Sequence, residues 1–182
     1  MDERKTIPYQ GLYELMRNIV TVVLAIVCLL TFVANNIQVQ GVSMEPTLAH
    51  GDEMIVHSIF YTPERGDIIV FSKQNFRDGA AIVKRVIALE GDVVDIDPIA
   101  GVVYVNGMAL YEPYTVEPTY FMGDISYPFT VPPGQIFVIG DNRNNSGDSR
   151  SSGHGTVDER EIIGRVVAVV LPLDRAGLFL RR

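Results

Sequence analysis

Residues 80–89 read Ala-Ala-Ile-Val-Lys-Arg-Val-Ile-Ala-Leu, an apolar run that only two adjacent basic residues interrupt. A second apolar run, Ile68 to Ser72, follows a Gly66-Asp67 turn signal. Short apolar runs that are bounded by turn residues are typical of buried β-strands. We therefore expect both segments to form strands.

The pattern of short runs continues along the chain. Asn106-Gly107 is a two-residue hairpin signal, and glycine or proline separates the runs at intervals of about ten residues. The sequence therefore predicts a mainly β protein, with an all-β domain of Greek-key or barrel type. The other expected strands are residues 53–57, 92–96, 102–105, 135–139 and 162–170.

Residues 111–133 differ from the rest of this domain, because they contain five prolines and several aromatic residues. We expect them to form a loop-rich excursion or a small β/loop subdomain. An ordinary packed loop is the alternative, and the sequence leaves the role of the segment open.

Residues 19–35 predict a single N-terminal transmembrane helix. Ile19 to Ala34 contain no charge, proline or glycine, although the run is slightly shorter than the usual ~20 residues. A cleaved signal peptide is the alternative, but no small-x-small cleavage site follows until Gly41. A buried core helix is disfavoured because the run has no polar face.

Basic residues are distributed asymmetrically around this run. Residues 1–18 contain three of them, and residues 35–52 contain none. The positive-inside rule then predicts that residues 1–18 lie in the cytoplasm. Residues 36–182 would form an extracytoplasmic domain that is anchored in the cell membrane.

The composition disfavours some classes of function. The net charge is −7 and no basic stripe is visible, so nucleic-acid binding has little electrostatic support. Cys28 is the only cysteine, so no intrachain disulfide can form. With 182 residues, the chain is long enough to form a stable hydrophobic core without disulfide bonds.

Residues 41–48 read Gly-Val-Ser-Met-Glu-Pro-Thr-Leu and place Ser43 shortly after the predicted span. A serine hydroxyl becomes a good nucleophile only when a base takes its proton. None of the three histidines in the chain has a compelling pattern of partners.

Lys84 is the better candidate for that base. On a strand it shares a face with Ile82 and Val86, while Arg85 points the other way. If that face is buried, desolvation lowers the pKa of the amine, which can then act as a general base. An edge lysine whose stem lies over apolar surface is the alternative.

Residues 140–150 read Gly-Asp-Asn-Arg-Asn-Asn-Ser-Gly-Asp-Ser-Arg, a stretch dense in turn formers and short polar side chains. Such a loop can direct a hydroxyl at a buried amine and pair an aspartate with an arginine. A solvated acidic turn is the alternative. The spacing lacks the regular calcium-binding pattern with a terminal glutamate, and we expect no metal and no cofactor.

Four blocks of the sequence together resemble the bacterial type I signal peptidases, which are membrane-bound serine endopeptidases with a Ser/Lys dyad. The blocks occur in the family's order, behind a span in the expected place, and cover about a quarter of the chain. The resemblance implies a transmembrane helix followed by an all-β catalytic domain. The blocks are residues 41–48, 65–71, 83–92 and 140–150.

The resemblance also implies roles for individual residues. Ser43 would be the nucleophile and Lys84 the general base. Ser146 would hydrogen-bond and orient the Lys84 amine. Asp148 and Arg150 would form a structural pair that holds the loop.

Two positions depart from the family's pattern. The oxyanion would be held by the Ser43 N–H and a second donor, which in some relatives is a side-chain hydroxyl two residues before the nucleophile. That position is Gly41 here, so the second donor is left open. Residues 151–155 lack the aromatic residue or proline that often follows the loop.

The implied substrates are exported pre-proteins, whose signal peptides would be removed by cleavage after small residues. The substrate would add as an extended strand beside residues 37–41 and 81–83. The implied partners are therefore pre-proteins and the lipid bilayer, whereas the range of substrates and the oligomeric state are left open. The positions that match the family's apolar pocket walls are Ile37, Val39, Met44, Ile82 and Val83.

A membrane-tethered β-domain that binds extended peptides without cleaving them is the main alternative. It also needs the anchor and a sheet edge, but only an enzyme needs Ser43 and Lys84 together. A self-cleaving transcriptional repressor is disfavoured by the N-terminal span and by the lack of a basic DNA-reading segment. A Ser/His peptidase of the eukaryotic type is disfavoured because a lysine occupies the matching block.

Overall fold

The computed structural model describes residues 9–74 and 79–179, with the backbone alone at residues 26–36. The chain divides into two compact units, Met1–Asn35 and Asn36–Arg182. Each unit is described by itself below.

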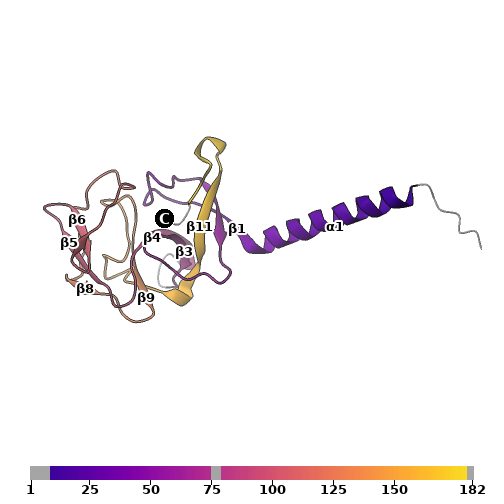
Figure 1. The fold of residues 1–182 in the computed structure, drawn as a ribbon. Coiled ribbons are helices and arrows are strands. Elements are labelled where there is room, and N and C mark those ends of the chain that lie inside the picture. The colour runs from indigo at the N-terminus through magenta and orange to yellow at the C-terminus, as the bar shows by residue number, and fades with distance from the viewer. Residues whose placement is uncertain (1–8, 75–78, 180–182) are drawn as a thin grey trace, which may run out of the picture. The chain divides into compact units, whose positions relative to one another are not determined.

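The first unit contains the helix α1, Gln10–Val33 (Figure 1). The helix ends two residues before the predicted boundary at residue 35, because the backbone is extended from Ala34 onward. Within the part of the chain that the structure describes, no helix is long and apolar enough to cross a membrane. The predicted transmembrane helix is therefore not found there, and the side chains of its second half lie outside the described residues.

The second unit is mainly β, which confirms the predicted class, and every pairing described here is antiparallel. An eight-stranded sheet has the order β1-β2-β11-β3-β4-β9-β10, with β12 paired to β11. Its strands are β1 (Ala34–Gln38), β2 (Glu53–His57), β3 (Ile68–Ser72), β4 (Ala81–Ala88), β9 (Gln135–Ile139), β10 (Val157–Asp158), β11 (Ile162–Leu171) and β12 (Gly177–Leu178).

A smaller four-stranded sheet has the order β7-β6-β5-β8. Figure 1 shows β5, β6 and β8 set apart from β3, β4 and β11 of the larger sheet. The strands are β5 (Val93–Asp97), β6 (Val102–Val105), β7 (Met108–Ala109) and β8 (Phe129–Thr130). Two short 3-10 turns, η2 (Glu159–Glu161) and η3 (Leu173–Arg175), flank β11.

All seven strands expected from the sequence are present, and β2, β3, β6 and β9 have the expected bounds. The predicted hairpin joins β6 to β7, and both turn residues, Asn106 and Gly107, have positive φ as such a turn requires. The longest strand, β11, lies between β2 and β3, which are consecutive in sequence. Closure of the large sheet into a barrel stays a prediction.

The strand β4 is buried on both faces, since every residue from Ile82 to Ala88 is inaccessible to solvent or nearly so. It pairs with β3 over Ala81–Arg85, but with β9 only at Arg85, Val86 and Ala88. Among the described residues, no strand pairs with the edge of Ala81–Lys84 that faces away from β3.

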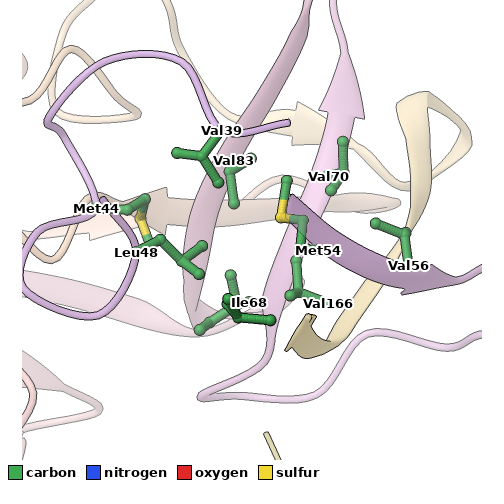
Figure 2. Packing of buried hydrophobic residues seen from close by; sticks show 10 residues of the cluster. Val39, Met44, Leu48, Met54, Val56, Ile68, Val70, Val83 and Val166 are labelled. Atoms are coloured by element: carbon green, nitrogen blue, oxygen red, sulfur yellow. The ribbon is translucent and has the colours of Figure 1, made fainter. Parts of the chain in front are cut away.

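The turn that carries Ser43 is fixed by the core beneath it. Met44 and Leu48 are buried and belong to one cluster with Ile68 and Val83, as Figure 2 shows. Burying a side chain of this kind stabilises a fold by ~1.5–3 kcal/mol. The turn is therefore held as firmly as a core element, although Ser43 itself is partly exposed to solvent.

Candidate active site

The structure brings Ser43 and Lys84 into direct contact, although 41 positions separate them in the sequence. The Lys84 Nζ donates to the Ser43 Oγ at 2.7 Å and to the Val83 carbonyl at 3.0 Å. Lys84 is only 4% exposed. The expected burial of its face is thus confirmed, and the alternative of a lysine at an exposed edge is wrong.

A second contact joins the Ser43 turn to the loop Gly140–Arg150. The backbone N–H of Asn142 donates to the Ser43 carbonyl at 3.0 Å, and its side-chain amide donates to the Val42 carbonyl at 3.1 Å. Asn142 therefore fixes the backbone on which the serine hydroxyl stands. Nothing in the sequence distinguished Asn142 from its polar neighbours in the loop.

Asp141 ties the same loop to β4. Its carboxylate is fully buried and accepts hydrogen bonds from Arg85 at 2.8 and 2.6 Å and from the Thr47 hydroxyl at 2.5 Å. One carboxylate thus connects β4, the Ser43 turn and the loop. The signal that could have pointed to this contact is the charge of Arg85 among apolar residues, since a buried charge requires a partner, but the sequence alone does not show that Arg85 is buried.

Asp148 and Arg150 form an ion pair at 2.7 Å in which both side chains are inaccessible to solvent. Asp148 also accepts the Gly140 N–H at 3.1 Å, and Arg150 Nη1 donates to the Arg143 carbonyl at 2.7 Å. The pair connects the two ends of the loop. The pair therefore holds the backbone at Gly140 and Arg143 against the end of the loop.

Ser146 does not make the hydrogen bond expected of it. Its hydroxyl is buried and makes no hydrogen bond with any residue that the structure describes. The hydroxyl packs against Gly140, where an added Cβ would lie 2.3 Å from the Ser146 Oγ. The expected bond to Lys84 is thus absent in this conformation, although both residues line the same cavity.

That cavity has a volume of about 620 Å³ and contains every residue expected in the pocket walls. Val39, Met44, Ile82 and Val83 are buried in its walls, and Ile37 is half-buried. Phe121, His154 and several polar side chains, among them Asn144 and Asn145, also line it. The cavity therefore places apolar walls and the Ser43–Lys84 contact in one space.

Gly41 has a φ of +94°, a conformation that side-chain-bearing residues rarely adopt. Its N–H donates to His50 Nδ1 at 3.2 Å. A Cβ at this position would meet no atom within 4 Å. The backbone conformation, and not lack of space, therefore favours glycine here.

His154 lies beside the loop in the segment that departs from the family's pattern. Its imidazole packs against Gly147, where an added Cβ would lie 2.9 Å from the ring. Lys73 Nζ donates to the His154 carbonyl at 2.5 Å and to the Thr156 carbonyl at 2.7 Å. Residues 151–155 are thus fixed by backbone contacts where an aromatic residue or proline was expected.

The described residues form no candidate metal site. Residues 9–74 and 79–179 contain no group of three or more His, Cys, Asp or Glu side chains that could hold a metal ion.

Comparisons with known proteins identify the family of the chain. The family model for signal peptidase, peptidase S26, matches residues 12–171. A probable signal peptidase I-2 from Synechocystis sp. is 39% identical over 97% of this chain and 81% of its own length. A signal peptidase I from Bacillus licheniformis is 32% identical over 95% of this chain and 96% of its own length.

A crystal structure of a signal peptidase I from Enterococcus faecalis is 31% identical in sequence, with a TM-score of 0.45. The match covers 58% of this chain and 97% of that one. Because the family model spans most of the sequence and the relatives align over nearly all of it, the chain belongs to the signal peptidase family, peptidase S26, as an enzyme of the signal peptidase I type.

Proposed function

We propose that the protein is a membrane-bound serine endopeptidase that removes the signal peptides of exported pre-proteins by cleavage after small residues. The observation that carries the proposal is the hydrogen bond of 2.7 Å between the buried Lys84 amine and the Ser43 hydroxyl. A hydroxyl within reach of a base is the arrangement that nucleophilic catalysis requires.

In the proposed mechanism, the Ser43 Oγ attacks the scissile carbonyl while the neutral Lys84 amine takes the hydroxyl proton. A neutral amine has a lone pair that can accept this proton across the observed distance, whereas an ammonium group has none. Burial favours the neutral form because it disfavours charge.

The tetrahedral intermediate then collapses as Lys84 returns the proton to the leaving amine. The mature protein departs, and the signal peptide remains bound to Ser43 as an ester. Lys84 next takes a proton from water as the water attacks the ester, and it returns this proton to the Ser43 Oγ as the signal peptide leaves. Both groups then stand as they did at the start. The Ser43 N–H would stabilise the oxyanion in both steps.

The cavity walls account for the expected preference for small residues. Ile82, Val83 and Met44 are already packed in the core, so they leave little freedom to accept a bulky side chain. A substrate strand would pair with the unpartnered edge of Ala81–Lys84, where β9 does not reach. Ile37 and Val39 would contact its other side.

Ser146 has a place in this mechanism despite its missing hydrogen bond. A buried hydroxyl without a partner is destabilising by ~1–3 kcal/mol. The Lys84 ammonium that forms after proton transfer lines the same cavity and could donate to this hydroxyl. We propose that Ser146 holds Lys84 in this way and that Asp148 and Arg150 hold the loop that carries Ser146.

The membrane anchor is proposed from the sequence. Residues 19–35 contain the uncharged run, and the basic residues lie before it and not after it. Residues 1–18 would then be cytoplasmic and residues 36–182 extracytoplasmic.

The experiment is cleavage of a pre-protein by the full-length protein in detergent, with the new N terminus located by mass spectrometry. We expect one cut after a small residue in the wild type and none with Ser43→Ala. Binding of the pre-protein without a cut in the wild type would favour the peptide-binding alternative. An equal cut by Ser43→Ala would exclude Ser43 as the nucleophile.

A further inference from the structure

Glu112, in the connection between β7 and β8, forms a two-pronged ion pair with Arg143 of the loop Gly140–Arg150. Its carboxylate accepts from Arg143 Nη1 at 2.6 Å and from Nη2 at 2.7 Å. The Arg143 side chain is inaccessible to solvent, and that of Glu112 is 11% exposed. A planar pair of this kind fixes orientation as well as distance.

Arg143 passes this constraint to the backbone beside Ser43. Its Nε donates to the Gly140 carbonyl at 3.1 Å. Gly140 is so close to Ser43 and Ser146 that an added Cβ would lie 2.4 Å from the Ser43 carbonyl oxygen and 2.3 Å from the Ser146 hydroxyl. A shift of Gly140 must therefore move one of these groups or both.

Tyr114 gives Glu112 a second connection to the site. The Tyr114 hydroxyl donates to Glu112 Oε1 at 3.0 Å. Two guanidinium groups lie over the Tyr114 ring, with the Arg85 Cζ 3.9 Å and the Arg143 Cζ 5.6 Å from its centroid. Because Arg85 adjoins Lys84 in sequence, the β7–β8 connection contacts β4 as well as the loop.

The same connection supports the far part of the loop. The Asn144 side-chain oxygen accepts the backbone N–H groups of Tyr120 at 3.0 Å and Phe121 at 3.1 Å. Arg150 Nη1 donates to the Phe121 carbonyl at 2.7 Å. Residues 112–121 therefore hold the loop at three of its positions.

The buried charge of Arg143 makes Glu112 the most important of these contacts. Burial lowers the pKa of Arg143, but the hydrogen bonds and charge of Glu112 outweigh burial and leave the pKa above its usual value. Arg143 thus keeps its charge inside the fold through Glu112. Without that carboxylate, a buried cation would lack its ion-pair partner, and the loop would have to open to hydrate it.

We propose that Glu112 is a positioning residue of the active site, which fixes the loop Gly140–Arg150 against Ser43 and Lys84 through Arg143. The inference rests on the proposed function, since it concerns the geometry of that reaction. It also assigns a role to the excursion at residues 111–133, which the sequence left open.

The test is Glu112→Gln in the full-length protein in detergent, with kcat and KM measured on a pre-protein. Glu112 is not among the described residues that line the cavity, so KM should change less than about twofold. A displacement of about 1 Å in a site reduces the rate by up to about 100-fold, so we expect kcat to fall by about 10- to 100-fold. Glu112→Asp, which keeps the carboxylate, should recover part of this loss.

The matched control is Arg65→Gln. It breaks another two-pronged pair, in which Arg65 donates to Asp92 at 2.9 and 2.5 Å, at a place that does not touch the loop. We expect kcat of this variant to stay within about twofold of the wild type. Equal losses of kcat in Arg65→Gln and Glu112→Gln would overturn the proposal, because the effect would then be general destabilisation.

Hydrogen exchange gives a readout that does not need activity. In Glu112→Gln, peptides from residues 140–150 should exchange faster than in the wild type, while peptides from β2 and β3 stay unchanged. Unchanged exchange in the loop would overturn the proposal even if kcat fell.

The exchange result also separates this proposal from the proposed function. If the wild type cleaved no pre-protein, the proposed function would fail, but the exchange rates of residues 140–150 would still show whether Glu112 holds the loop. If Glu112→Gln did not fold, the same comparison with Glu112→Asp would decide it.

Discussion

Arg85 and Asp141 form an ion pair at 2.6 Å that sets the position of the neighbouring Lys84. Because side chains alternate along a strand, Arg85 points to the opposite face from Lys84. The pair to Asp141 on that face fixes the β4 backbone and the start of the loop together. Thr47 of the Ser43 turn donates to the same carboxylate.

Removal of the Asp141 charge should therefore destabilise the fold and the site together. Asp141→Asn leaves Arg85 as a buried charge without a full partner, and breaking such a pair typically lowers the free energy of unfolding by ~3–5 kcal/mol. Urea unfolding of the full-length protein in detergent measures the change. Arg160→Gln breaks the exposed pair with Asp158 and should shift stability by less than about 1 kcal/mol. If Asp141→Asn changed the free energy of unfolding by less than about 1 kcal/mol as well, the Arg85–Asp141 pair would not be what holds β4 and the loop together.

Cleavage should rise with pH as Lys84 loses its proton. The amine is buried, so we expect an apparent pKa well below the ~10.4 of a free lysine. Lys84→Ala removes the base, and kcat should fall by ~10²–10⁴ and lose this pH dependence. The measurement is kcat from pH 6 to pH 11, with circular dichroism at each pH to verify that the fold is intact. A wild-type rate that rises only above about pH 10 would exclude a lysine with a lowered pKa.

The sequence was most informative where one local pattern determines structure. The runs that became β3 and β4 are apolar because both are buried in the large sheet, and the Asn106-Gly107 turn has the backbone that its residues favour. The strands β10 and β12 have two residues each and exist only because a longer strand lies beside them. Such strands leave no periodic pattern in the sequence.

In the active site too, the contacts between distant residues were the ones that local sequence patterns could not predict. The approach of Ser43 to Lys84 was expected from a resemblance, since no spacing in the sequence encodes a contact across 41 positions. The pairs of Arg85 with Asp141 and of Arg143 with Glu112 were not expected, because a surface charge and a buried one look alike in sequence. The expected bond from Ser146 is absent because the Lys84 amine donates to Ser43 and to the Val83 carbonyl, and no pattern in the sequence encodes that choice of partners.

Gly41 should resist replacement, and a hydroxyl there should not improve the enzyme. Its φ of +94° strains any residue with a Cβ, at roughly 1–2 kcal/mol. A Cβ there would have no atom of Ser43 within 4 Å, so nothing in the described structure would orient a serine hydroxyl toward the oxyanion. We expect Gly41→Ser and Gly41→Ala to lower kcat equally. A Gly41→Ser variant that cleaves tenfold faster than Gly41→Ala would show that the hydroxyl acts as the second donor.

Asp92 should contribute to the loss of stability in acid. Burial raises the pKa of this carboxyl, but hydrogen bonds from Arg65, from the Leu89 N–H and from Asn106 outweigh burial and leave the pKa below its usual value. A carboxyl with a lowered pKa in the folded state binds its proton more weakly there than in the unfolded chain. Its contribution to stability is therefore present above the unfolded value of ~3.9 and is lost as pH falls through the folded value.

Asp92→Asn should remove this contribution at every pH. The wild type should be more stable than the variant at pH 7, and the difference in Tm should shrink as pH falls from about 5 to 2, because Asp92 becomes protonated in the wild type. The other carboxyls titrate in both proteins, so their effect cancels from the difference. Thermal unfolding followed by circular dichroism measures both curves. A difference that stayed constant down to pH 2 would mean that Asp92 acts through the shape of its hydrogen bonds and not through its charge.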